Sequence, residues 1–311
     1  MAKHKTGASI RLALFAIVLC LGACSGTTFV YNRLDTIVPW YVDDYVDLNG
    51  NQEQQLDEEL QPFLDWHRQQ ELPRYVQLLD ELDGSLDQPI TAKEVAVIYD
   101  GIEVAWLRLE EESLDWLLEL GGTLSDEQVQ EFLAYLQERQ EEYEEEYLPR
   151  TEAEYREETY DNFADSFEDY MGRLDSGQLE RLQQASADME RSDAVWLQER
   201  AAWLQRLAVL MQREPGWQQR VRDAVAARGD TVSERYQEVF QHNLEVVFSS
   251  VADLLNSRSE KQDRRLRGEL ADLREDLQVL IAEGKSTSSA ATLAQAQGSA
   301  GPTVNPAVTN P

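Results

Sequence analysis

The stretch VQEFLAYLQERQEEYEEEYLPRTEAEYREETYDNFADSFEDYMGRL, residues 129–174, carries the clearest periodicity of the chain. Its apolar side chains recur three and four positions apart, as they do on the buried face of an α-helix with 3.6 residues per turn. One face comprises Val129, Phe132, Leu133, Leu136, Tyr143 and Tyr147, and a second comprises Tyr155, Phe163, Phe167, Tyr170 and Leu174. The stretch therefore predicts two amphipathic helices that meet at Pro149.

The same helical period extends in both directions, from Val30 to about Ile281, with almost no alternating strand pattern. We predict an all-α fold, an elongated multi-helix bundle with a coiled-coil-like helix at its C-terminal end. Breaks between periodic runs are marked by Pro89, Gly121-Gly122, Pro149, Pro215-Gly216 and Gly229. Pro39, Pro62 and Pro73 fall inside periodic runs, where proline removes a backbone donor, so they should kink or shorten the helices.

A five-residue pattern recurs at several predicted helix starts. Its copies are residues 48–52, 90–94, 124–128 and 174–178, with capping residues Asn49, Thr91, Ser125 and Asp175. In each copy an apolar residue precedes the capping side chain, and Gln or Glu follows three positions later, as in a capping box. The pattern also resembles the LTxxQ repeat of the small periplasmic stress chaperones. That resemblance implies a helical protein that holds unfolded clients, whereas plain helix starts are the simpler explanation, because capping boxes recur in any all-α protein.

The N-terminus has the features of a secretory signal. Basic Lys3, Lys5 and Arg11 precede an apolar segment, residues 12–21, that is shorter than the ~20 residues a membrane span needs. Leu21-Gly22-Ala23-Cys24 then resembles the lipobox of bacterial lipoproteins. The resemblance implies that residues 1–23 are removed, that Cys24 is acylated, and that Ser25 directs the protein to the outer membrane, facing the periplasm. An ordinary signal peptidase site is the alternative.

We expect the helical body to span residues 24–283 and the tail, residues 284–311, to be disordered, because the tail is rich in Ser, Thr, Ala, Gln and Gly without aromatic residues. Just before the tail, leucines alternate four and three apart. They are Leu266, Leu270, Leu273, Leu277 and Leu280. This heptad seam predicts either a homodimer or packing against the protein's own body.

Charge and cysteine content limit the partners. The chain has 59 acidic residues, 28 basic residues and a formal net charge of -31, which opposes binding to nucleic acid and to anionic lipid headgroups. Partners are therefore expected to be cationic or to be proteins. The chain has 2 cysteines, Cys20 in the signal segment and Cys24 at its end, so no disulfide is expected in the body.

Catalytic patterns are scarce. His67 and His242 are the histidines outside the signal segment, and no nucleophile, nucleotide or zinc motif is present in the sequence. Asp47, Asn49, Asn51 and Glu58 have the spacing of calcium-loop ligands, but Gln52 occupies the position where such a loop needs glycine. We expect no metal, no cofactor and no enzymatic activity. A hydrolase built on paired carboxylates is the less favoured alternative.

The densest acidic run, residues 138–169, is interleaved with aromatic residues. As a surface, it would bind cationic or unfolded segments through Tyr143, Tyr147, Tyr155, Phe163 and Phe167. As a packed helix face, it would turn those rings into the core. The basic cluster of residues 258–267 could instead dock on this run from within the chain. The surface interpretation predicts a chaperone-like or adaptor protein in the periplasm, and a purely structural lipoprotein is the alternative.

Two further segments resemble an uncharacterised family of proteobacterial outer-membrane lipoproteins. They are FVYNRLD (29–35) with PWYVDDYVDL (39–48), and WHR (66–68) with ELPRY (71–75). Membership implies a helical envelope lipoprotein and no catalytic residues. In the second segment, His67, Arg68, Glu71 and Arg74 would form either a polar site or an ordinary network within one helix. In the first, Phe29, Tyr31, Trp40, Tyr41 and Tyr45 would lie either at the lipid headgroups or in the core.

Overall fold

The computed structural model describes the backbone of residues 26–298 and the side chains of residues 26–285. The described residues form helices and their connections, and no strand is found among them, so the all-α prediction is confirmed. The elements are α2 (Gly26–Tyr31), α3 (Leu34–Asp43), α4 (Gly50–Trp66), the π-helix η1 (His67–Glu71), α5 (Leu72–Ser85), α6 (Ala92–Thr123), α7 (Asp126–Tyr147), α8 (Glu152–Met171), α9 (Ser176–Asp188), α10 (Asp193–Leu210), α11 (Trp217–Ala226), α12 (Glu234–Asn256) and α13 (Glu260–Gly298).

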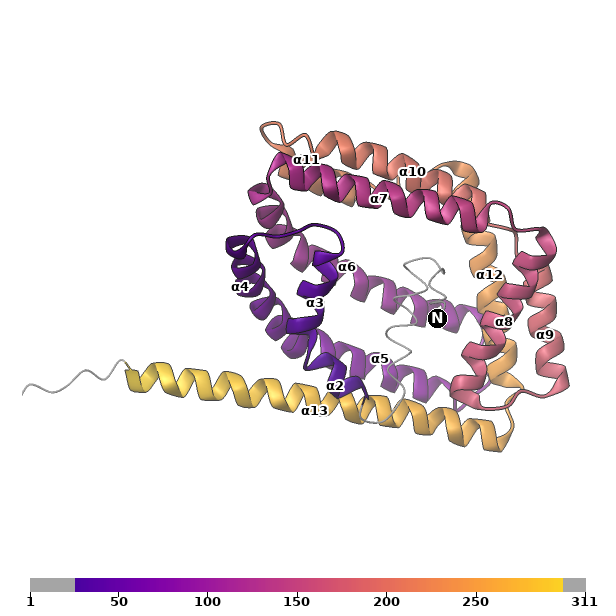
Figure 1. The fold of residues 1–311 in the computed structure, drawn as a ribbon. Coiled ribbons are helices and arrows are strands. Elements are labelled where there is room, and N and C mark those ends of the chain that lie inside the picture. Colours follow the sequence, from indigo (N-terminus) through magenta and orange to yellow (C-terminus); the bar gives the residue numbers. More distant parts are fainter. Residues whose placement is uncertain (1–25, 299–311) are drawn as a thin grey trace, which may run out of the picture.

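Pairs of helices form the sides of a frame, and we call this arrangement the frame (Figure 1). Helix α7 lies beside α10, α8 packs on α9, α9 packs on α12, and α5 lies along α13. The 32-residue helix α6 contacts both α4 and α12, so it joins two edges of the frame. None of the helices within residues 26–298 combines the length and the apolar character needed to cross a bilayer.

The four predicted capping boxes are all present. Each capping side chain accepts a hydrogen bond from the backbone N–H three residues later, and the Gln or Glu at that position accepts one from the backbone N–H of the capping residue. The capping residues are Asn49, Thr91, Ser125 and Asp175. Because α4 begins at Gly50, residues 51–58 are helical and cannot wrap around an ion as a calcium loop does. Within the described residues, no cluster of three or more His, Cys, Asp or Glu side chains is arranged to hold a metal.

The glutamines of these boxes also join helices to one another. Nε2 of Gln178 lies 3.2 Å from Oε1 of Gln262, and Nε2 of Gln262 lies 2.9 Å from Oε1 of Gln178. Gln262 belongs to a further capping arrangement with Ser259 at the start of α13. A second pair, Gln52 with Gln128, joins the starts of α4 and α7 in the same way. We call each of these a glutamine clasp.

The leucine seam of α13 packs within the chain. Leu266 and Leu270 join the core cluster with Leu86 and Leu255, and Leu277 and Leu280 are buried with Leu72 and Tyr31. Of the two expectations for the seam, the structure shows packing against the protein's own body, on α5. A homodimer would have to use another surface.

Helix α13 does not end at the predicted boundary before residue 284, since its backbone is helical to Gly298. Gly284 is an internal helix residue rather than a terminator. A Cβ on it would lie 2.5 Å from Cδ of Arg68, so glycine here lets the Arg68 side chain cross the helix closely. Residues 285–297 contain neither glycine nor proline, so nothing in this part of the sequence interrupts the helix. Residues 299–311 of the predicted disordered tail lie outside the described residues.

Candidate functional site

A π-turn at residues 67–71 brings a cluster of polar side chains together. Pro73 lies within a continuous helical path from Gly50 to Ser85, and it has no amide to donate to the turn before it. The helical turn here contains one residue more than an α-helical turn, because the backbone N–H of Leu72 donates to the carbonyl of His67, five positions earlier. Pro73 was expected to kink or shorten its helix. Its observed effect is this wider turn, after which α5 continues in register.

Glu71 is the fully buried carboxylate of the cluster. Arg108 of α6 donates two hydrogen bonds to it, from Nε to Oε1 at 2.9 Å and from Nη2 to Oε2 at 2.7 Å. Arg74 donates to it from the next turn. Burial alone would raise the pKa of Glu71, but the hydrogen bonds and charges of Arg108 and Arg74 lower it below its ordinary value. Both carboxylate oxygens are thus engaged with guanidinium groups, which suits anchoring of α6 rather than proton transfer.

His67 lies between two tyrosines. The Tyr31 hydroxyl lies 2.8 Å from Nδ1, and the Tyr75 hydroxyl lies 3.3 Å from Nε2. Burial lowers the pKa of His67 to about 4, with Glu71 opposing and Arg68 assisting the shift. Burial likewise raises the pKa of Tyr31 to about 12 and raises that of Tyr75. At neutral pH the imidazole is therefore uncharged, with one nitrogen donating and the other accepting.

The cluster also fixes helix α2 to the body. Arg68 donates to Asn32 at 2.9 Å, and its guanidinium lies 5.0 Å from the centre of the Tyr31 ring. Asn32 in turn donates to Glu283 of α13 at 3.0 Å. The sequence grouped His67, Arg68, Glu71 and Arg74, and the structure brings them together. It adds Tyr31, Tyr75 and Arg108, which sequence reasoning did not assign to the group.

The aromatic residues of the acidic run lie mostly in the core. Tyr147 and Tyr155 are buried, Phe163 packs on Leu182 and Leu254, and Phe167 joins the same core. Tyr143 is half-buried, and guanidinium groups of this chain, Arg139 at 5.0 Å and Arg200 at 5.1 Å, already lie over its ring. The packed-face alternative is what the structure shows for these five side chains.

From the basic cluster of residues 258–267, Arg265 donates a hydrogen bond to the backbone carbonyl of Asp169 in the acidic run. Arg267 instead pairs with Asp83 and Asp87 at the end of α5. Of the N-terminal aromatic residues, Tyr31 is buried and Tyr45 packs against Tyr135, while Phe29, Trp40 and Tyr41 are exposed. Cys24 and Ser25 lie outside the described residues.

Helix α6 exposes an apolar and acidic face that sequence reasoning missed. Val97, Val104 and Leu107 are 56%, 49% and 50% exposed. Asp100 and Glu111 are exposed as well, and the five residues follow one another at spacings of three and four. They therefore form one stripe along the helix, which we call the α6 seam. Its signal in the sequence is this same spacing, which predicts a helix face without showing whether anything covers it.

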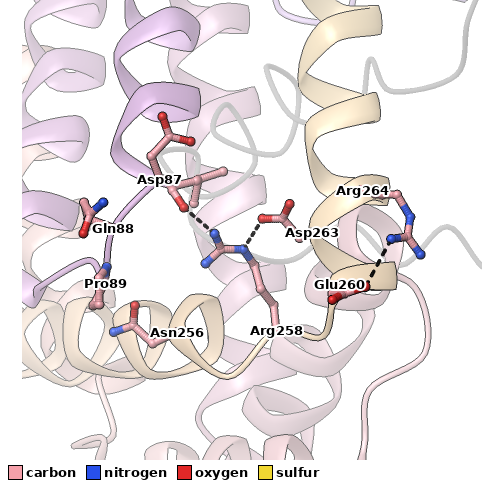
Figure 2. Close-up of a pocket in the computed structure, with 9 residues that line it drawn as sticks. Asp87, Gln88, Pro89, Asn256, Arg258, Glu260, Asp263 and Arg264 are labelled. Atoms are coloured by element: carbon pink, nitrogen blue, oxygen red, sulfur yellow. Dashed lines mark hydrogen bonds and ion pairs between the residues drawn. The ribbon is translucent and has the colours of Figure 1, made fainter.

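Two shallow hollows lie at helix corners. The first, of about 480 Å³, is lined by the α5–α6 and α12–α13 connections. Figure 2 shows Arg258 directed toward Asp263 and the turn at Asp87, and its Nε donates to Asp263 at 2.7 Å. The second, of about 490 Å³, includes His242, which lies 2.8 Å from the Asp188 carbonyl. These polar groups bond within the fold, so both hollows are joints between helices.

Comparison with known families identifies the chain. The model of a family of unknown function, DUF6279, matches residues 44–237. The chain belongs to the DUF6279 family. In this DUF6279 protein the match includes the WHR and ELPRY segments, so it covers the α6 seam and the π-turn cluster except for Tyr31. No curated protein and no solved structure matches the chain.

Proposed function

We propose that this protein is a non-enzymatic lipoprotein, anchored in the outer membrane through acylated Cys24, whose helical body binds other envelope proteins as a chaperone or adaptor. The α6 seam is the observation that carries the proposal. Val97, Val104 and Leu107 are each about half exposed along one face of α6, and such an apolar patch suits a surface that another chain covers.

The spacing of the seam indicates the shape of the partner. Residues 97, 100, 104, 107 and 111 alternate three and four apart, which is the repeat that lets two helices pack side by side. Asp100 and Glu111 interrupt the apolar positions and would be left unpaired against a wholly apolar helix. A helix with Lys or Arg at the facing positions satisfies them. The partner is therefore an amphipathic helix with basic residues in its apolar face.

The interior supports this use of α6. Arg108 follows Val104 by four positions and precedes Glu111 by three, so it flanks the seam, and its bidentate pair with Glu71 holds α6 against η1 there. The exposed seam thus runs beside an ion pair that fixes α6 to the body. The net negative charge would also attract basic segments from a distance before the apolar contact forms.

Site-specific photo-crosslinking in intact cells tests the proposal. A photoreactive residue at Leu107 should capture proteins through basic amphipathic helices, which mass spectrometry of the crosslinked peptides identifies. The same residue at Val209 of α10, which is also exposed, is the matched control. Asp100→Lys together with Glu111→Lys should reduce capture at Leu107 without unfolding the body, as checked by circular dichroism.

Equal capture at Leu107 and Val209, or capture that the charge reversal leaves unchanged, would show that the seam does not select partners. A purely structural role would then be favoured. The glutamine clasps and the internally bonded corner hollows are the observations that fit such a role.

A further inference from the structure

Exposed apolar side chains continue from helix α2 to helix α3 as one stripe. Trp40 is the most exposed of them at 77%, and Phe29, Ile37 and Tyr41 are also exposed. The Arg33 guanidinium lies 4.7 Å from the centre of the Phe29 ring. Ile37 follows Arg33 by one helical turn, and Trp40 and Tyr41 follow Ile37 by three and four positions. We call these residues, with Arg33, the N-terminal stripe.

In the sequence, the stripe begins shortly after the predicted lipid attachment. Helix α2 begins at Gly26, two residues after Cys24, and two residues of extended chain reach only ~7 Å. Helix α2 cannot swing freely, because Tyr31 bonds to His67, and Asn32 bonds to Glu283 and Arg68. Acyl chains on Cys24 would therefore hold the stripe at the membrane surface.

The side chains of the stripe suit that surface. Tryptophan and tyrosine favour the boundary between lipid headgroups and acyl chains, where their rings are apolar and their N–H and O–H groups stay hydrated. Among the described residues Arg33 forms no ion pair, so its charge is available to a lipid phosphate. Asp44, one turn beyond Trp40 on the same side, marks the end of the stripe away from Cys24.

We infer that the acyl anchor holds the N-terminal stripe on the phospholipid headgroups, against the repulsion expected from the net charge of -31, and that the stripe fixes the orientation of the whole frame relative to the membrane. The inference depends on the lipid anchor of the proposed function. It differs from the headgroup interpretation of the sequence in its members, since Tyr31 and Tyr45 turn inward to His67 and Tyr135.

Depth measurement with a single spin label tests this orientation. The mature chain has no cysteine except acylated Cys24, so an introduced cysteine is the unique free thiol. The lipidated full-length protein is reconstituted into vesicles of phosphatidylethanolamine and phosphatidylglycerol, carrying Ile37→Cys or, as the control, Val209→Cys, each with a nitroxide. The accessibility of the label at position 37 to a water-soluble paramagnetic chelate should be about tenfold lower than that of the label at position 209, because the stripe enters the headgroup layer.

A second variant keeps the result independent of folding. Trp40→Asp in the Ile37→Cys background should restore chelate access to the label while leaving the helical circular dichroism unchanged. If the protein floats with the vesicles and the two labels are equally accessible, the stripe does not contact lipid and the inference is wrong. If the protein fails to float with the vesicles, the anchor on Cys24 is wrong, and the inference falls with it.

Discussion

The side-chain amides of Gln52 and Gln128 bond to each other in both directions. Nε2 of Gln52 lies 3.0 Å from Oε1 of Gln128, and Nε2 of Gln128 lies 2.7 Å from Oε1 of Gln52. Each oxygen also accepts from the backbone N–H of its own helix cap, at Asn49 or Ser125. Each nitrogen donates its second proton to a backbone carbonyl two residues before the partner's cap. All the bonding capacity of both amides is used.

Gln128→Glu should destabilise the fold by about 1–3 kcal/mol at pH 7, because the carboxylate brings acceptors where Gln52 and Asp47 need a donor. Chemical denaturation followed by circular dichroism measures the change. The deficit should shrink as the pH falls and the introduced carboxyl gains a proton that it can donate.

Glu94→Gln is the matched control. Glu94 closes the capping box with Thr91 but is exposed and makes no clasp, so its amide variant should leave the unfolding midpoint nearly unchanged. Equal midpoints for Gln128→Glu and the wild type would show that the clasp contributes nothing to stability.

The sequence identifies the capping boxes but not the clasps. A capping box depends on residues three positions apart, whereas Gln52 and Gln128 are 76 positions apart, and no local pattern encodes their meeting. The boxes at Thr151 and Ser259 were missed, although both have the required spacing. Arg150 and Arg258 stand before them where an apolar residue was expected, so they did not fit the five-residue pattern.

His67 should make stability fall as the pH drops from about 6.5 to about 4. Its pKa is lowered from 6.5 to about 4 in the fold, so the unfolded chain takes up the proton first. The stabilisation is complete above the unfolded pKa and is lost as the pH falls toward the folded one, by about 3 kcal/mol in all. Denaturation midpoints measured across this range report the slope.

His67→Gln should flatten that slope, while His242→Gln, at an exposed histidine outside the cluster, should not. A His67→Gln protein with the wild-type pH dependence would contradict the burial of a neutral imidazole between Tyr31 and Tyr75.

Arg108→Met should cost about 3–5 kcal/mol, because it leaves the fully buried Glu71 carboxylate without its bidentate partner. Arg74→Met removes the more exposed partner and should cost about 0–1 kcal/mol. Because the folded pKa of Glu71 is lowered, its ion pairs contribute above the ordinary carboxyl pKa, and this contribution is lost as the pH falls through the folded value. Similar costs for the two variants at pH 7 would refute the assigned geometry.

Much of the π-turn cluster follows from local spacing, and the rest does not. His67, Arg68, Glu71 and Arg74 lie within two turns of one helix, so the sequence groups them. Arg108 comes from α6, 37 positions from Glu71, and only the tertiary packing of α6 on η1 brings it there. Periodicity likewise showed that Tyr147 and Tyr155 share helix faces with other apolar residues, but which helices cover those faces depends on the frame.

Substitution by alanine at two glycines of α13 should change the stability of the fold in opposite directions. Nothing lies within 4 Å of a Cβ at Gly268, so Gly268→Ala should stabilise the helix by about 0.5–1 kcal/mol. A Cβ at Gly284 meets Arg68 Cδ at 2.5 Å and Cγ at 2.9 Å, so Gly284→Ala should displace Arg68 from Asn32 and destabilise the fold. Thermal unfolding compares the two. If Gly284→Ala also stabilises, α13 does not approach Arg68 as described.

Cys24→Ala should release the protein from the membrane, because the acyl chains are its proposed anchor. Several acyl chains, at ~0.8 kcal/mol per buried CH₂, would hold the wild-type protein stably on the membrane. The apolar segment at residues 12–21 is too short to span the membrane in their place. Cell fractionation should find the variant in the soluble periplasmic fraction. Ser25→Asp serves as the second arm, since it should keep the protein membrane-bound but shift it toward the inner membrane. Wild type and Cys24→Ala in the same soluble fraction would overturn the lipid anchor.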